Sequence, residues 1–242
     1  MIIGNPKVSI ILTSYNNPFV ERAIKSVFNQ TYKNWELILL DDNSNKKEVL
    51  KIYEKYINHP KVKFFNSKIK EEDRWKECPY ARQINIGLKM ATGKLISYMC
   101  DDVEYLPHRL EKMVKFLKKH PFVKVCYGRQ YLKIIQNGKV VYERILKPDR
   151  ILRDPTKKVD HNSIMHYKSC LKKVGLWITK PPIETDFSKR ELFRMADAWF
   201  FRKLGKYYPF YPIKEILDIH YHTEQGFSEK VFKKFGYKGI YD

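Results

Sequence analysis

Cysteine is scarce in this sequence of 242 residues, and the few cysteines lie far apart. They are Cys78, Cys100, Cys126 and Cys170, and no two of them form a CxxC pair. This spacing excludes a zinc ribbon and a disulfide framework, because both need closely spaced or systematically paired cysteines. We therefore expect reduced thiols and a cytoplasmic protein.

Long apolar runs are also absent. No stretch approaches the roughly 18 consecutive apolar residues of a membrane-spanning helix. Residues 1–6 do not join a charged segment to an apolar one, as a signal peptide would. The sequence therefore predicts neither a signal peptide nor a membrane span, and its length suits one α/β domain with a well-buried core.

Acidic residues are few relative to basic ones. The chain has 47 Lys and Arg against 27 Asp and Glu, which gives a formal net charge of +20. Such an excess attracts polyanions: nucleic acid, an anionic membrane face, nucleotide phosphates or acidic glycans. The sign of the charge does not choose among them, and solvated lysine-rich helix faces would give the same count.

Glycine is sparse too, and the 10 glycines form neither GxGxxG nor GxxxxGK[ST]. The glycine-rich phosphate loops of many nucleotide-binding proteins are therefore missing. A nucleotide bound by this chain would need a metal ion and basic side chains to neutralise its phosphates.

What the sequence does contain is an alternation of apolar runs and helical patterns. Residues 8–13, 35–40 and 62–65 read as strands. One helical pattern covers residues 19–28, and a second follows the polar residues 41–45 and ends at about residue 58. Strands that alternate with helices favour a parallel sheet with right-handed crossovers. The fold class that we predict is α/β.

The apolar run from Ile96 to Val103 carries two adjacent carboxylates, Asp101 and Asp102. As the end of a buried strand, they would lie where open α/β sheets bind ligands. Adjacent carboxylates repel each other, so we expect a cation to neutralise them, most simply a divalent metal ion. The alternative is that one of them caps the helix that begins near Pro107.

A second carboxylate pair, Asp41-Asp42, follows residues 35–40 on the same predicted edge. An acidic side chain at this place in a nucleotide-binding α/β unit typically contacts the ribose or the base. We therefore expect a nucleotide site that Asp42 helps to form.

The pattern is less regular in the second half. After a loop at 66–79 we expect these further elements: a helix at 80–91, a helix from 107 to 120, a strand at 123–127, a hairpin of 130–135 with 139–145, a strand at 161–166, a short helix at 168–174 and a helix at about 190–204. The charged loop 147–159 contains Pro148 and Pro155 and is the candidate for a mobile flap.

Taken together, several segments resemble glycosyltransferase family 2, the inverting enzymes of the GT-A fold, and within it the bacterial spore coat polysaccharide glycosyltransferases. The segments are Val8 to Asn16, Ser26 to Tyr32, Glu36 to Ser44, Ala91 to Lys94, Asp101-Asp102, Asp160-His161, Met165 to Leu176, Ala196 to Phe200 and Tyr208 to Pro212. The resemblance covers roughly residues 7–220. It implies a Rossmann-like, mostly parallel central sheet flanked by helices, with a smaller mixed subregion on the acceptor side.

The resemblance also implies roles for residues of the first half. Thr13, Tyr15 and Asp42 would hold a uridine-type base and its ribose, and Arg74 would reach the base or the phosphates. Asp102 would bind Mn²⁺ or Mg²⁺, and Asp101 would assist through the ribose or a metal-bound water. Many members read Asp-x-Asp-Asp here, whereas this chain has Met99 at the first position.

In the second half, Asp197 matches the catalytic base of the family, which often follows a Glu, here replaced by Ala196. A general base takes the proton of the attacking hydroxyl. His161, His220 and His222 are weaker candidates; the His220-x-His222 spacing puts both rings on one face of a strand, as a metal pair or as solvated histidines.

The implied function is transfer of a sugar from a nucleoside diphosphate sugar, UDP- or dTDP-linked, to a hydroxyl of a glycan or cell-surface polysaccharide. We expect one domain, with a nucleotide-sugar-binding half (1–104), an acceptor half (105–222) and a basic aromatic tail (223–242). We also expect a cytoplasmic protein that contacts the anionic inner membrane face peripherally and binds no specific nucleic acid. The alternatives are a sugar-phosphate nucleotidyltransferase and a non-enzymatic basic module for nucleic acid or anionic glycan.

Overall fold

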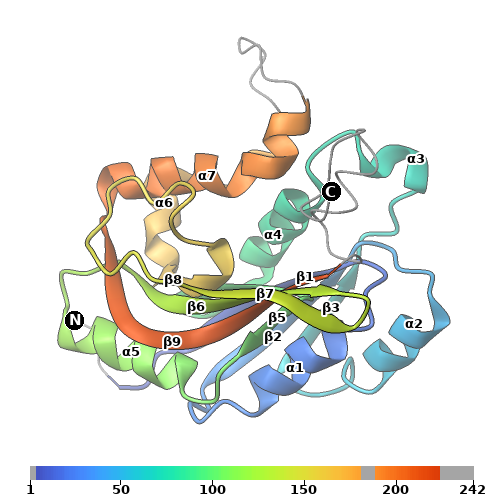
Figure 1. Cartoon of the computed structure of the whole chain (residues 1–242), viewed down its shortest axis with the longest axis horizontal. Coiled ribbons are helices and arrows are strands. Elements are labelled where there is room, and N and C mark those ends of the chain that lie inside the picture. Colours follow the sequence, from blue (N-terminus) through green and yellow to red (C-terminus); the bar gives the residue numbers. More distant parts are fainter. Residues whose placement is uncertain (1–3, 181–188, 224–242) are drawn as a thin grey trace.

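The structure is a computed structural model that describes residues 4–180 and 189–223, with side chains from residue 196 onward in the second range. In this part of the chain one nine-stranded sheet runs through both halves, in the order β3-β2-β1-β4-β8-β6-β9-β5, with β7 paired to β6 (Figure 1). The strands are β1 Val8–Ser14, β2 Trp35–Asp41, β3 Val62–Asn66, β4 Leu95–Cys100, β5 Val103–Tyr105, β6 Val125–Gln136, β7 Lys139–Leu146, β8 Ile164–Tyr167 and β9 Phe210–Thr223.

Helices cover both faces of this sheet. Those with four or more residues are α1 Val20–Phe28, α2 Lys47–Glu54, α3 Glu71–Arg74, α4 Pro79–Met90, α5 Arg109–Lys119, α6 Leu171–Val174 and α7 Lys189–Tyr207; the 3-10 turns are η1 His161–Ser163 and η2 Lys168–Cys170. Figure 1 shows α1, α2 and α5 below the sheet and α4, α6 and α7 above it. None of the described helices is long and apolar enough to cross a lipid bilayer.

The first four strands in the sheet order, β3, β2, β1 and β4, are parallel. Every residue of β1 and β2 is buried, which is typical of parallel strands covered by helices on both faces. The predicted strands at 8–13, 35–40 and 62–65 and the predicted α/β fold class are therefore confirmed. Asp42 and Asp101 follow β2 and β4 at the same edge of the sheet, where ligands of open α/β sheets bind.

The second half differs from the expectation in three places. Residues predicted as a separate strand and hairpin arm form one strand, β6, which pairs with β7, β8 and β9 and changes register near Arg129. Apart from the short stretch around His220 and His222, the long strand β9 was not predicted, because its register partner β6 lies far away in the sequence. Residues 161–166 begin with the turn η1 before the short strand β8.

The loop at 147–159, the expected mobile flap, contacts the body of the protein at several points. Leu152 is buried and exchanges two backbone hydrogen bonds with Phe210. The carbonyl oxygen of Arg150 accepts a hydrogen bond from the hydroxyl of Tyr127 at 2.6 Å. A Cβ added at Gly205 would lie 2.0 Å from the carbonyl oxygen of Arg153, so the loop packs directly on α7. The expected tail, by contrast, lies outside the described residues from 224 onward.

A buried ion pair joins the two halves of the sheet. Arg109 of α5 and Asp218 of β9 are both fully buried, with 3.2 Å between Nε and Oδ2. Arg109 also donates to the hydroxyl of Ser97 at 2.8 Å and to the carbonyl oxygen of Asn162 at 2.6 Å. Its guanidinium lies 3.7 Å from the ring centroid of Tyr105. One side chain thus ties α5, β4, β5, β9 and the loop before β8 together.

We predict that Arg109→Met lowers the free energy of unfolding by about 3–5 kcal/mol, because it leaves the carboxylate of Asp218 buried without its cation. Urea unfolding followed by circular dichroism measures the change. The control is Lys112→Met on the same helix, where Lys112 and Glu215 form an exposed ion pair and the expected change is within about 1 kcal/mol. Equal losses in the two variants would contradict the assigned role of Arg109.

Candidate active site

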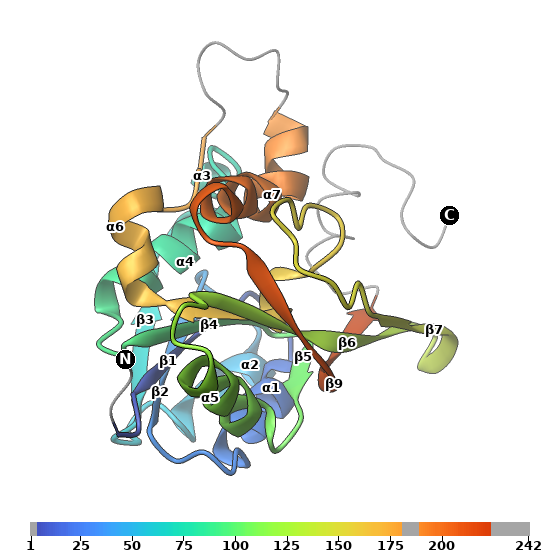
Figure 2. The same cartoon turned by 90° about the vertical axis from the view of Figure 1, so that its left-hand side faces the viewer.

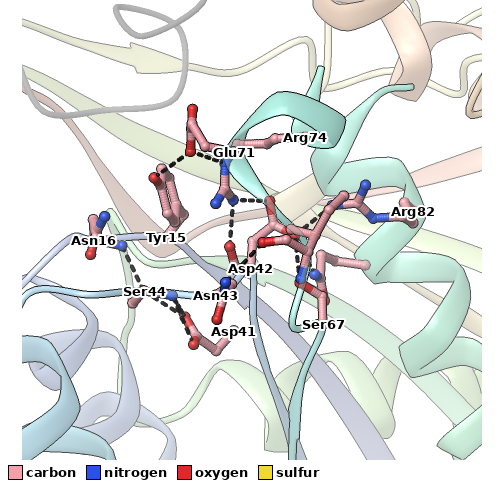
Figure 3. A network of polar contacts seen from close by, with 12 residues as sticks. Tyr15, Asn16, Asp41, Asp42, Asn43, Ser44, Ser67, Glu71, Arg74 and Arg82 are labelled. Atoms are coloured by element: carbon pink, nitrogen blue, oxygen red, sulfur yellow. Dashed lines mark hydrogen bonds and ion pairs between the residues drawn. The ribbon is translucent and has the colours of Figure 1, made fainter. Parts of the chain in front are cut away.

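Asp42 is the centre of a buried network just beyond β2. Its carboxylate forms ion pairs with Arg74 and Arg82, each at 2.5 Å. It also accepts hydrogen bonds from the side chains of Gln83 at 2.6 Å and Ser67 at 3.2 Å. Two cations and two neutral donors thus converge on one carboxylate, as Figure 3 shows for the two arginines and Ser67.

Tyr15 and Arg74 form the outer part of the same network (Figure 3). The guanidinium of Arg74 lies 3.6 Å from the ring centroid of Tyr15, and both side chains bind Glu71, at 3.0 Å from the Tyr15 hydroxyl and 2.8 Å from Nε of Arg74. Burial opposes the charge of Arg74, but Glu71 and Asp42 outweigh it and raise its pKa. Arg74 was expected in a loop; it lies instead on the short helix α3.

The first carboxylate of each pair has a structural role. Asp41 accepts hydrogen bonds from the backbone N–H and hydroxyl of Ser44, and from Tyr53 and Asn66. Asp101 accepts from the backbone N–H of Tyr15 at 3.2 Å and from the side chain of Asn17 at 2.8 Å. Asp41 therefore shapes the turn after β2, and Asp101 holds the loop after β1 against the end of β4.

Asp102 lies in a second cluster, which contains histidines and one more carboxylate. Its Oδ1 is buried, accepts no hydrogen bond from any described residue and lies 3.5 Å from Nε2 of His220. The other ring nitrogen of His220 is 3.6 Å from Asp160. Burial opposes the charge of His220, but Asp102 and Asp160 outweigh it and raise its pKa to about 9. His220 thus balances the charge of Asp102.

His222 lies beside His220 on the same face of β9, as the sequence spacing predicts. The two ring centroids are 4.4 Å apart. Burial and the charge of His220 lower the pKa of His222 to about 4, so this ring is neutral at ordinary pH.

Thr13 and His161 flank the strand end between the two clusters. Thr13 is buried at the end of β1, opposite Cys100 in the register, with its hydroxyl 3.9 Å from the sulfur of Cys100. His161 contacts the same sulfur through Nε2 at 3.2 Å, and its Nδ1 lies 3.7 Å from Asp160. This strand end is where the sheet order changes direction around β1, the usual ligand position in open α/β sheets.

Asp197 lies on α7, close enough to His161 and Asp160 for their charges to act on its carboxylate. Burial raises the pKa of Asp197 to about 6; the charge of His161 opposes this shift and that of Asp160 adds to it. A carboxylate with this pKa is largely ionised at neutral pH and retains appreciable affinity for a proton.

The residues around Asp102 are compatible with a divalent metal ion. Asp102 offers carboxylate oxygens, the ligand type that Mg²⁺ and Mn²⁺ prefer, and its Oδ1 has His220 as an ion-pair partner at 3.5 Å but accepts no hydrogen bond from a described residue. Among the described side chains, no three His, Cys, Asp or Glu residues converge on one point. This is compatible with an ion held by one carboxylate, with substrate phosphates and water as the remaining ligands.

The predicted site residues thus fall into two groups. Tyr15, Asp42 and Arg74 converge in one. Asp102 lies in the other, where His161 and Asp160 also act on the charge of Asp197. Thr13 and Asp101 lie near the strand ends. The sequence interpretation missed the following members: Glu71, Arg82, Gln83 and Asp160. Arg82 and Gln83 lie in the first half of the helix α4, which contacts β1 and β2, and no sequence pattern around them indicates that they meet Asp42.

Comparison with known proteins agrees with this geometry. The family model described as glycosyl transferase family 2 matches residues 9–173. Protein CgeD of Bacillus subtilis is 36% identical over 229 residues, which cover 92% of this chain and 51% of CgeD. A glucosyltransferase of Escherichia coli, WfgD, named for UDP-Glc and α-D-GlcNAc-diphosphoundecaprenol, is 30% identical over 151 residues, covering 58% of this chain and 55% of WfgD.

Among solved structures, TarS of S. aureus in complex with UDP-GlcNAc superimposes with a TM-score of 0.60 at 18% identity, covering 91% of this chain and 59% of that one. At this identity the likeness supports the fold. The chain spans about half the length of the curated relatives it matches. On the family model and the identity to CgeD, the chain belongs to glycosyl transferase family 2.

Proposed function

We propose that this chain is a metal-dependent, inverting glycosyltransferase that moves a sugar from a UDP-sugar or a related nucleoside diphosphate sugar to a hydroxyl of a glycan. The observation that carries the proposal is a row of ion pairs from Asp102 to His161, near which Asp197 lies. Asp102 pairs with His220, His220 with Asp160, and Asp160 with His161, whose charge acts on Asp197. A metal-binding carboxylate and a proton acceptor would thus belong to one site.

The nucleotide would bind at the network around Asp42. Tyr15 supplies an aromatic face, and Asp42 supplies a carboxylate that can accept hydrogen bonds from the base or ribose. Arg74 now covers the ring of Tyr15, so binding of the base would move this side chain toward the phosphates. Arg82 stays available to balance the charge of Asp42 when Arg74 leaves.

A Mg²⁺ or Mn²⁺ ion at Asp102 would neutralise the diphosphate that departs with the nucleotide. Inversion requires the acceptor hydroxyl to attack from the face opposite the leaving group. Asp197 comes from α7 in the second half of the chain, so it can take the proton of that hydroxyl. The names of WfgD and of the TarS complexes support a UDP-linked donor.

We predict that Asp102→Asn removes the Mn²⁺ dependence of UDP binding. UDP affinity of the variant in Mn²⁺ should equal that of the unmodified chain in EDTA, because the amide no longer supplies an anionic ligand. Isothermal titration calorimetry measures both. Asp73→Asn is the control for net charge, since Asp73 is partly exposed and its one ion pair with a described residue is to Lys76. An unchanged response of Asp102→Asn to Mn²⁺ would show that the metal ligand is elsewhere.

Asp42→Asn should weaken UDP binding both with and without Mn²⁺, because the proposed contact to the base or ribose does not involve the metal. We expect a loss of roughly tenfold or more, typical of a hydrogen bond to a charged group. Isothermal titration calorimetry with UDP, in Mn²⁺ and in EDTA, measures both affinities. A loss seen only with Mn²⁺ would instead place Asp42 near the phosphates.

We predict that Asp197→Asn lowers the rate of sugar transfer by about 10² to 10⁴ while UDP affinity stays unchanged. In the unmodified chain the rate should fall as the pH drops below about 6, since protonated Asp197 accepts no further proton. Release of UDP from a panel of UDP-sugars follows the reaction. Loss of UDP binding in the variant would place Asp197 in the donor site, and an unchanged rate would make another group the base.

A further inference from the structure

Three strands of the second half present one continuous face next to the proposed site. In the register, Asp218, Gln130 and Leu146 form one row across β9, β6 and β7. The next two rows are His220, Leu132 and Arg144, and then His222, Ile134 and Tyr142. Side chains two apart on a strand share a face, so all nine point to the same side of the sheet.

This face contains a cleft of about 440 Å³, which these residues line together with Asp160, apart from Asp218. His220 and Asp160 are the residues that pair with each other beside Asp102. The cleft therefore opens directly from the proposed reaction site. Figure 2 shows that β6 and β7 project from the body of the protein, on the other side from β2 and β3.

Among the described residues, the charged side chains of the cleft have partners at its end near Asp102 but not at its hairpin end. Near Asp102, Asp160 accepts two hydrogen bonds from Asn162 and lies close to His161 and His220. Toward the hairpin, Arg144 is exposed and pairs with no acidic side chain of residues 4–180 and 196–223. The hairpin end of the cleft is thus positively charged.

The cleft also offers contacts suited to a sugar. Tyr142 of β7 is 49% exposed, so its ring is free for stacking. Gln130 is buried at the bottom of the cleft, donates to Asp218 at 2.8 Å and has an Oε1 that accepts no hydrogen bond from a described residue. An aromatic ring, an amide oxygen and a guanidinium together favour a ligand with hydroxyl groups and a negative charge.

We propose that this cleft binds the acceptor and that Arg144 anchors a negatively charged group on it, a phosphate or a carboxylate. The acceptor class is then an acidic or phosphorylated glycan. This inference rests on the proposed function, because the reacting hydroxyl must reach Asp197 while the anion lies at β7. Two strand spacings separate His220 from Arg144, on the order of 10 Å between backbones, so the anion lies beyond the reacting carbon.

The experiment compares three sugars as probes of the cleft: glucose, glucose 6-phosphate and glucuronate. Each is titrated into the chain with UDP and Mn²⁺ saturating, so that the donor site is filled, and again without UDP. We expect at least one anionic sugar to bind roughly ten- to a hundredfold more tightly than glucose, through a charge-assisted hydrogen bond to Arg144. The preferred one distinguishes a phosphate from a carboxylate.

Arg144→Gln should remove this preference and leave the affinity for glucose unchanged. The matched control is Lys133→Gln, which removes the same charge from the same hairpin on its other face, opposite Glu143 in the register. Tyr142→Ala should lower the affinity for all three sugars by the same factor, since stacking on the ring does not depend on the negative charge of the sugar. Thermal unfolding confirms that each variant is folded.

Three results would overturn the proposal. They are equal binding of glucose and both anionic sugars, equal losses in Arg144→Gln and Lys133→Gln, and a loss of UDP affinity in Arg144→Gln, which would assign Arg144 to the donor. Failure of the unmodified chain to bind UDP would count against the proposed function alone, because the titrations without UDP still report on the cleft.

Discussion

The arrangement of this protein depends on a guanidinium that water does not reach. Arg109 is fully buried, and its cost of desolvation is offset by Asp218, by the hydroxyl of Ser97 and by the carbonyl oxygen of Asn162. These partners come from strands β9 and β4 and from the turn η1. A buried charge accepts few arrangements of its partners, so Arg109 fixes how the parallel strands of the first half meet the mixed strands of the second.

This constraint extends to the proposed reaction site through Asn162. Its side-chain oxygen accepts a hydrogen bond from the backbone N–H of Cys100 at 2.7 Å, and its amide nitrogen donates to Asp160 at 2.6 Å. Cys100 directly precedes the carboxylates at the end of β4, and Asp160 pairs with His220. The position of η1 therefore sets where Asp160 lies relative to Asp102, although neither contacts Arg109 directly.

The sequence predicts the first half well because its signals are local. Buried apolar runs mark β1 and β2, and Asp42, Asp101 and Asp102 follow strand ends that periodicity reveals. The rest depends on contacts between distant segments. No pattern around Arg82 indicates that it meets Asp42, and nothing local in β9 indicates that β6 is its partner. The burial that raises the pKa of Asp197 likewise exists only once α7 packs onto the sheet.

The pairing of β6 with β9 also has a consequence for how the chain folds during synthesis. The register pairs Val125 with Phe210. After β6 has been synthesised, roughly 80 further residues must therefore be added before its parallel neighbour β9 is present. At about 5–20 residues per second that delay lasts several seconds. During this time β6 is an open sheet edge able to pair with another chain. Charged side chains on an open edge disfavour such pairing, and β6 carries Arg129 and Lys133.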